Sequence, residues 1–508
     1  MELEFDRDTI IGYETAAEMT LCQEETLESI VPDACPDILR IVDVCGQAEL
    51  RGKQARENSA VVSGFVRATI LYLPEGQDGV RRMEVGLPFT CQLEAPGLSD
   101  RGVVLASPRL RSAEARALNP RKVLLRVDLA VDIKACQPVE RTVCRGVLED
   151  EENTICQRQF QGETYLISTI QEKNFTFSER VRVPSGQSEA GQLMALRAQP
   201  ICTESKLIGS KLIFKGAVEL SMLLQEAGGN LVSSHESLPF SQVMEVSGAG
   251  EENDCEISVE LSDVQWETLL EEHGILEVTL ELIAQAQVRG RRPVTLLQDL
   301  YSTFRQMEVD NEKQLLWQQV EQSVRPQAIR ELLETGELVR SVVDSRLALG
   351  PVSQSREGNQ LILNAETWIT VLYLDEQEQL QCIRNMIPVS LRMECPAEHL
   401  CSCTSQCQGE VFAAPGAGGV EVRFTLEFHC RTQRQLAVSC VKYAKLGDVR
   451  HSEPGDAPSL ILRLATPGEG LWELAKTYGT TREQILQANE LTEEELPEGK
   501  MLLIPKVR

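Results

Sequence analysis

The stretch VSGFVRATILYL, residues 62–73, decides how the rest of the chain is interpreted, because a similar segment occurs three times. Self-similarity at a long period is the signature of repeated structural units. The run has the composition of a β-strand, and a polar turn follows each copy. The other copies are FKGAVELSMLL, residues 214–224, and LNAETWITVLYL, residues 363–374.

A short run with a proline follows each copy at a nearly constant distance. Pro88 lies 24 residues after Gly64, whereas Pro239 and Pro388 lie 23 residues after Gly216 and Ala365. A later apolar run, VLLRVDL at 123–129, has counterparts at 274–280 and 418–424. We therefore expect three homologous units, which we place at 1–160, 161–315 and 316–446.

The residue pattern within these units indicates β-structure. Val127, Leu129, Val131 and Ile133 alternate with polar residues, which is typical of a half-buried antiparallel strand. Proline cannot donate to a ladder, so we place the three prolines at a strand start or on an edge strand. The expected fold is mainly β, with three tandem β-sandwich-like units whose free edges offer a route to self-association.

Two segments favour short helices instead. Pro36 and Asp37 precede Ile38, Ile41 and Val42, a spacing that predicts one helical turn. The segment 328–336 ends in a glycine suited to a helix stop and predicts a second helix.

The composition limits the classes of partner. The chain has 508 residues and a formal net charge of −27, which repels phosphate backbones and anionic lipids. Its amino terminus carries acidic residues where an export signal needs basic and apolar ones, and no apolar run is long enough to span a membrane. We expect a cytosolic protein that binds no nucleic acid and inserts into no membrane, with its sixteen cysteines reduced.

Motifs that carry chemistry are missing from the sequence. We find no phosphate-binding loop, dinucleotide turn, His-Glu-x-x-His or nucleophile elbow. The sequence therefore predicts no enzyme and no cofactor.

One cluster leaves an alternative open. Cys395, Cys401, Cys403 and Cys407 surround His399, and thiolates with imidazole are zinc ligands. A strand would direct Cys401 and Cys403 to the same face without the tight turn of a zinc knuckle. Buried or free thiols are the favoured interpretation, and a metal-dependent enzyme is the alternative.

The chain changes character after a polar, proline-containing linker at 447–458, and we place a separate module at 459–508. A strand at 460–464 precedes a helix over 471–478, which Gly479 ends. Thr481 and Gln484 form the pattern of a capping box ahead of a second helix, and the last residues return as a strand. The predicted order is β-α-α-β.

This module resembles the LysM family through PGEGLW at 467–472, YGTT at 478–481, NEL at 489–491 and the closing segment 497–505. LysM modules commonly bind N-acetylglucosamine backbones in a shallow groove. The chain has Gly-Glu-Gly where the family usually has Gly-Asp-Thr, so a helix-capping hydroxyl is lost. Trp472 is expected to be a core anchor rather than a sugar platform. The resemblance assigns the groove to Gly468, Glu469, Gly470, Leu471, Leu496, Pro497 and Gly499.

The body resembles the SPOCS domain of spore-envelope proteins from endospore-forming Firmicutes. The resemblance rests on Pro32-Asp33 and Pro36-Asp37, on the 62–73 strand, on Leu87-Pro88-Phe89, and on Asn119-Pro120-Arg121. SPOCS copies followed by one LysM module are similar to the SipL-like spore coat morphogenetic proteins. The resemblance implies a scaffold in the mother cell whose LysM end docks onto the ATPase of the coat's basement layer at the forespore. Binding of peptidoglycan or cortex glycan is the alternative.

Overall fold

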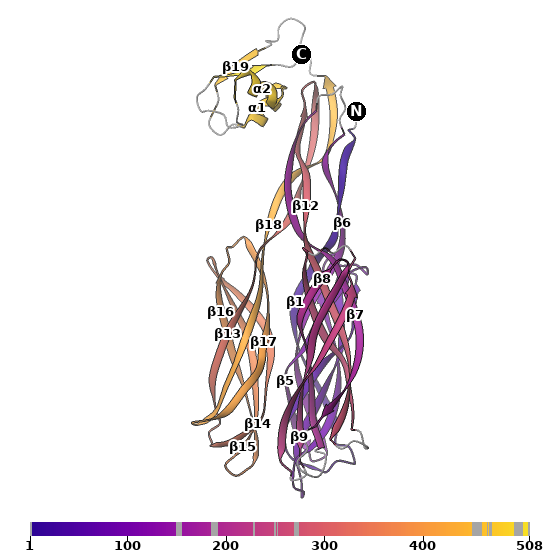
Figure 1. Ribbon diagram of the computed structural model, residues 1–508, viewed down its shortest axis with the longest axis vertical. Coiled ribbons are helices and arrows are strands. Elements are labelled where there is room, and N and C mark those ends of the chain that lie inside the picture. Colours follow the sequence, from indigo (N-terminus) through magenta and orange to yellow (C-terminus); the bar gives the residue numbers. More distant parts are fainter. Residues whose placement is uncertain are drawn as a thin grey trace.

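The computed structural model describes residues 3–148, 155–183, 192–226, 229–247, 250, 252–268, 274–449, 460–464, 466, 470–491 and 501–505. The body consists of three sets of six antiparallel strands, which we name units 1, 2 and 3 (Figure 1). Unit 1 contains β1 (Phe5–Ile30), β2 (Ile38–Arg56), β3 (Ser59–Pro74), β4 (Arg81–Glu94), β5 (Val103–Asn119) and β6 (Lys122–Val147). Unit 2 contains β7 (Ile155–Arg182), β8 (Gln192–Ile208), β9 (Lys211–Gln225), β10 (Leu231–Glu245), β11 (Asp254–Thr268) and β12 (Ile275–Ser302). Unit 3 contains β13 (Arg305–Glu334), β14 (Val339–Glu357), β15 (Gln360–Asp375), β16 (Leu380–Glu394), β17 (His399–Gly416) and β18 (Gly419–Val449).

Each unit is a sandwich of two three-stranded sheets. The fifth, sixth and first strands form one sheet, and the second, third and fourth strands form the other. Pairing of β1 with β7 joins the first of these sheets in units 1 and 2 into one six-stranded sheet, in the order β11-β12-β7-β1-β6-β5. The inward side chains of both sheets build one apolar core per unit. Along β6, Val127, Leu129, Val131 and Ile133 are all buried, as their alternation predicts. The predicted fold class, mainly β with three sandwich-like units, is confirmed.

The glycine of the opening stretch has a packing role. Gly64 on β3 lies opposite Phe89 on β4, and a Cβ at Gly64 would come within 2.2 Å of the Phe89 ring. Gly216 lies opposite Phe240 in the same way, with a ring atom 2.7 Å from such a Cβ. In unit 3 the opposed pair is Ala365 and the smaller Val389. Glycine is thus present in the two units where a phenylalanine ring lies over this position, because any larger residue would collide with the ring.

The three repeated prolines lie on edge strands, as predicted. Pro88, Pro239 and Pro388 belong to β4, β10 and β16, each of which is the outer strand of its three-stranded sheet. The missing N–H can therefore face away from the ladder.

The two short helices predicted in the body are wrong. Residues 33–35 form a turn and Ile38 begins β2, whereas 328–334 lie within β13 and pair with β18. The register of β2 against β3 shifts between Ile38 and Arg40 and again between Ile41 and Asp43. Two β-bulges within six residues break the period of two, which produces apolar spacing that mimics a helix.

The predicted unit boundaries also need correction. The boundary after 160 cuts β7, and the boundary after 315 cuts β13, although these strands pair over their length with β12 and β18. The first strand of each unit carries none of the repeated landmarks. Its start therefore could not be located by comparing the copies.

The turn between β5 and β6 holds the loop between β1 and β2. Arg121 donates from Nη1 to the carbonyl oxygen of Cys35 at 2.7 Å and from Nη2 to that of Val31 at 3.0 Å. It also reaches the carboxylates of Asp33 and Asp37. The Asn-Pro-Arg turn between β5 and β6 thus holds the Pro-Asp loop between β1 and β2.

The long first and last strands of each unit continue beyond the sandwiches as three two-stranded ribbons, which together form a stalk (Figure 1). A β-bulge marks the same place in each ribbon, at Ala16, Ser168 and Val320, where the register shifts by one residue. Bulges increase strand twist and bend the ribbon. Side chains from all three ribbons pack together inside the stalk, including Ile10, Val143, Val294, Leu296, Leu316 and Val438.

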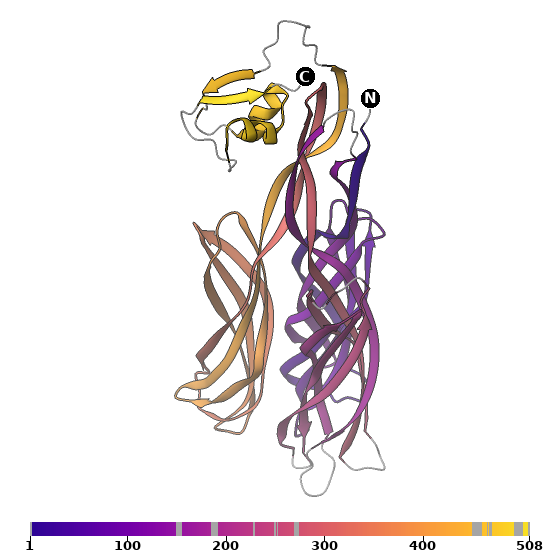
Figure 2. The same ribbon diagram turned by 45° about the horizontal axis from the view of Figure 1, so that its top comes forward.

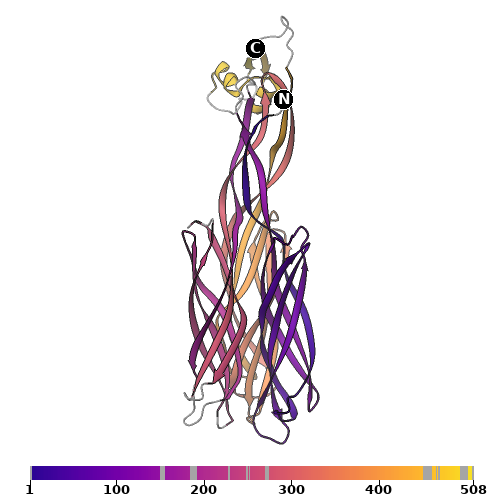
Figure 3. The same cartoon turned by 90° about the vertical axis from the view of Figure 1, so that its right-hand side faces the viewer.

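The three sandwiches lie side by side, with units 1 and 2 flanking unit 3 in Figure 3. Leu71, Leu223 and Leu372 occupy equivalent positions on β3, β9 and β15, and all three are buried in one shared cluster. Beside it, Arg346 of unit 3 makes two hydrogen bonds to Asp43 of unit 1, at 2.6 and 2.7 Å. Arg197 of unit 2 binds Asp344 of unit 3 at 3.0 and 3.3 Å, so the chain of charges links all three units.

Candidate functional site

The carboxyl-terminal module has the predicted β-α-α-β order. It contains β19 (Leu460–Leu464), α1 (Leu471–Tyr478), α2 (Arg482–Ala488) and β20 (Met501–Pro505), with β19 antiparallel to β20. Gly479 ends α1 with a left-handed φ of 65°, and Thr481 forms a capping box with Gln484. Gly470 caps α1 without a side-chain hydrogen bond, as the loss of the family's hydroxyl predicts.

Helix α1 packs against the end of the stalk (Figure 2). Trp472 is 6% exposed, and its ring lies edge-on to that of Tyr301 on β12, with 5.0 Å between the centroids. The indole Nε1 donates to Asp299 Oδ2 at 2.8 Å. Trp472 is therefore an anchor, but between the module and the stalk rather than within the module alone.

Polar contacts surround this anchor. Lys476 Nζ lies 2.8 Å from both carboxylate oxygens of Asp299, and the Tyr301 hydroxyl donates to the carbonyl oxygen of Thr480 at 2.8 Å. Burial, with a hydrogen bond to Cys156, raises the pKa of Tyr301, so its hydroxyl stays protonated as a donor. Arg158 on β7 pairs with the more exposed Glu473 at 3.3 Å.

The structure gives a partial view of the predicted groove. Gly468, Glu469, Leu496, Pro497 and Gly499 lie outside the described residues. Gly470 is exposed, whereas Leu471 is 3% exposed and packs in the module core. A contact from the Leu471 side chain to a ligand would require this core to open, so only backbone groups are available there.

The sheet of the module presents an apolar outer face. Leu460, Leu462 and Leu464 on β19 and Met501 on β20 are 48 to 63% exposed. The alternate residues Leu502 and Ile504 are buried beneath the helices. We call the exposed side chains of Leu460, Leu462, Leu464 and Met501 the apolar sheet face. Exposed apolar patches of this kind commonly mark contacts with other proteins.

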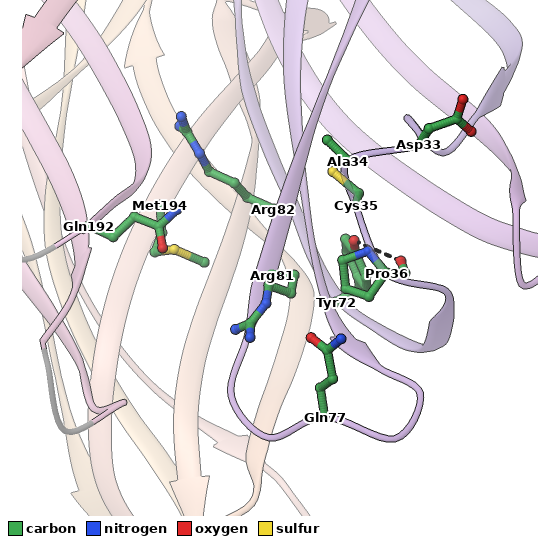
Figure 4. A pocket seen from close by; sticks show the side chains of 10 residues that line it. All are labelled: Asp33, Ala34, Cys35, Pro36, Tyr72, Gln77, Arg81, Arg82, Gln192 and Met194. Atoms are coloured by element: carbon green, nitrogen blue, oxygen red, sulfur yellow. Dashed lines mark hydrogen bonds between the residues drawn. The ribbon is translucent and has the colours of Figure 1, made fainter.

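The body holds a shallow depression of about 470 Å³ between units 1 and 2 (Figure 4). Arg81 and Arg82 line it beside Tyr72, whose hydroxyl donates to the carbonyl oxygen of Pro36 at 3.1 Å. Burial raises the pKa of Tyr72 to about 12, so the phenol stays neutral. The described lining offers no pairing of a nucleophile with a base.

The cysteine cluster seen in the sequence is rearranged in space. Cys401 and Cys403 face the core of unit 3 from β17, as a strand predicts. The sulfur of Cys403 contacts that of Cys430 on β18, which sequence spacing did not reveal because the hairpin between the strands separates the two residues. Among the described residues, no group of three His, Cys, Asp or Glu side chains is arranged to hold a metal ion.

Sequence reasoning also missed the stalk residues that hold the module. Asp299, Tyr301 and Arg158 lie at least 170 residues from α1 along the chain. No local pattern distinguishes them from other strand residues. Within the described part of the chain, no helix is long and apolar enough to cross a membrane.

Comparison with known proteins identifies the parts of the chain. The family described as SipL, SPOCS domain matches residues 37–116 and 189–269, which cover β2–β5 of unit 1 and β8–β11 of unit 2. The LysM domain family matches residues 466–505. Unit 3 has the same strand order but lies outside both SPOCS segments. Neither curated proteins nor solved structures gave a match.

Both matched domains belong to non-catalytic families. SipL-type domains indicate association with the sporulation coat, and a LysM domain is a module of the peptidoglycan-binding type. The chain therefore contains two segments similar to the SipL-type SPOCS domain and a carboxyl-terminal segment similar to the LysM domain.

Proposed function

We propose that this chain is a non-catalytic scaffold in endospore coat morphogenesis. Its LysM module docks onto a coat basement-layer protein, a morphogenetic ATPase, at the forespore surface. The scaffold acts in the cytoplasm of the mother cell. The SPOCS and LysM matches support the role in the coat, and the partner is the further step of this proposal.

The observation that carries the proposal is the position of the module. A stalk built by all three units holds the LysM module at one end of the molecule (Figure 1). The side chains of the apolar sheet face are exposed. Leucine and methionine side chains offer a sugar no aromatic stacking surface, but they suit an apolar protein surface. This favours a protein over a glycan at this face.

Imaging of tagged protein in sporulating cells tests the proposal. The full chain should surround the forespore, and a chain that ends at Val449 should remain diffuse in the mother cell. Leu462→Asp places a charge on the apolar sheet face and should weaken localisation at least tenfold. Leu315→Asp, which changes an exposed leucine on the stalk, is the matched control and should localise normally. Unchanged localisation of the truncated chain would refute the proposal.

The LysM match favours a second candidate, binding of glycan that contains N-acetylglucosamine. The groove would comprise Gly470 and Leu471 together with the predicted residues outside the described part, Gly468, Glu469, Leu496, Pro497 and Gly499. Sedimentation with insoluble peptidoglycan separates the candidates. Our proposal predicts that the full chain stays in the supernatant, whereas retention that depends on 459–508 would favour the glycan.

A further inference from the structure

One pair of opposed residues in the core of each sandwich is apolar in units 1 and 2 but consists of two cysteines in unit 3. Counted from the hairpin turn before the sixth strand, Ile133, Ala286 and Cys430 are equivalent. Ile133 lies opposite Ala106 on β5, and Ala286 lies opposite Ile257 on β11. Both are apolar pairs of one large and one small side chain. In unit 3 the opposed residues are Cys430 and Cys403.

The two sulfur atoms of this pair are in contact. Cys430 Sγ donates to Cys403 Sγ at 3.4 Å. Directly opposed residues of antiparallel strands have Cα atoms about 4.5 to 5.5 Å apart, a range that lies within the 4.4 to 6.8 Å typical of disulfides. A covalent bond here needs only a small movement of the side chains.

We propose that Cys403 and Cys430 are an oxidation site, at which a peroxide converts the two thiols of unit 3 into a cross-strand disulfide. The Sγ–Sγ bond forms as the thiols lose two electrons and two protons, and hydrogen peroxide accepts them to become two water molecules. The bond joins the edge strand β17 to the central strand β18 and encloses the hairpin between them.

The surroundings make this a slow reaction at neutral pH. A hydrogen bond with Cys401 lowers the pKa of Cys430, but the hydrogen bond with Cys403 and burial outweigh it and raise the pKa to about 12. Thiolates are the reactive form, so the pair stays reduced in a reducing cytoplasm. Cys403 is half-buried whereas Cys430 is buried, so Cys403 is the more accessible residue of the pair.

The test oxidises the purified full-length chain with hydrogen peroxide and maps disulfides by tandem mass spectrometry under non-reducing conditions. We expect a Cys403–Cys430 link with a loss of two hydrogen atoms, faster at pH 9 than at pH 7. The thermal midpoint of the oxidised chain should rise by roughly 5 °C and return when the bond is reduced. A wild-type chain in which Cys430 forms no link, or links to another cysteine, would overturn the proposal.

Variants separate this bond from general oxidation. Cys407→Ala removes a thiol on the same strand and face that lies opposite Leu426, and it should keep both the link and the rise in midpoint. Cys430→Ala resembles the alanine of unit 2 at this position and should abolish both. An equal rise of the midpoint in Cys430→Ala would contradict the proposal even if the link were detected in the wild type.

Discussion

The paired charges between the units are the most informative individual residues. Burial opposes ionisation of Asp43, but the charge and hydrogen bonds of Arg346 outweigh it and hold the pKa of Asp43 below its usual value. The same balance, with Arg197, lowers the pKa of Asp344. Both carboxylates are therefore charged at neutral pH, and each depends on an arginine from a different unit.

We expect Arg346→Ala to destabilise the chain by about 3 to 5 kcal/mol, because it leaves the buried Asp43 carboxylate without its partner. Urea denaturation measures the change. Arg126→Ala is the matched control, because Arg126 pairs with Glu24 on the exposed face of unit 1, where the loss of a salt bridge has little effect. A midpoint for Arg346→Ala equal to that of the control would show that the ion pair does not join the units.

Glu260 should make the folded chain less stable as the pH rises, whereas the lowered pKa values of Asp43 and Asp344 give stability that is lost as the pH falls. Burial raises the pKa of Glu260 from 4.5 to about 7, although Ser107 of unit 1 donates a hydrogen bond to it at 3.0 Å. The folded chain binds this proton more tightly than the unfolded chain. The contribution is therefore present below pH 4.5 and is lost as the pH rises to about 7.

Glu260→Gln should remove that loss. We expect the variant to be more stable than the wild type at pH 8, by about 1 to 2 kcal/mol after allowance for partial contact with solvent, and equal to it at pH 4.5. Thermal denaturation at both pH values provides the measurement. A variant that is less stable at pH 8 would mean that the carboxylate is favourably ionised in the fold.

At the scale of elements, helix α1 and the ribbon of β7 and β12 form one contact. Asp299→Ala removes the acceptor of both Trp472 and Lys476, so we expect amide hydrogens of 471–478 to exchange about tenfold faster. Glu473→Ala removes only the exposed pair with Arg158 and should change exchange little. Equal protection of α1 in the two variants would show that Asp299 does not hold the module.

The strands could be predicted where their pattern is local. The 62–73 run, the edge prolines and the capping box at Thr481 each follow from neighbouring residues and are seen in the structure. The counterparts of the apolar run 123–129 lie two residues later than the sequence indicates. Counted from the start of the sixth strand, Leu125 is equivalent to Val278 and Val422. A strand repeats every two residues, so a shift of two leaves its pattern unchanged.

At the scale of the whole molecule, the sequence could not predict how the units assemble. Asp43 and Arg346 are about 300 residues apart in the sequence, and the leucines of the shared cluster come from three different units. Such contacts depend on register and bulges in three separate sheets, which no local pattern encodes. Asp299 and Tyr301 also contact the LysM module across a long separation in the sequence. The packing of the module on the stalk could therefore be learned only from the structure.

The position of the LysM domain on a three-unit body is the basis of the proposed scaffold, and co-purification from sporulating cells tests it most directly. Full-length tagged chain should recover the basement-layer ATPase, and a chain ending at Val449 should not, although its circular dichroism should still report folded β-structure. Equal recovery of the ATPase by both chains would contradict the account, because the body alone would then make the contact that we assign to the LysM domain.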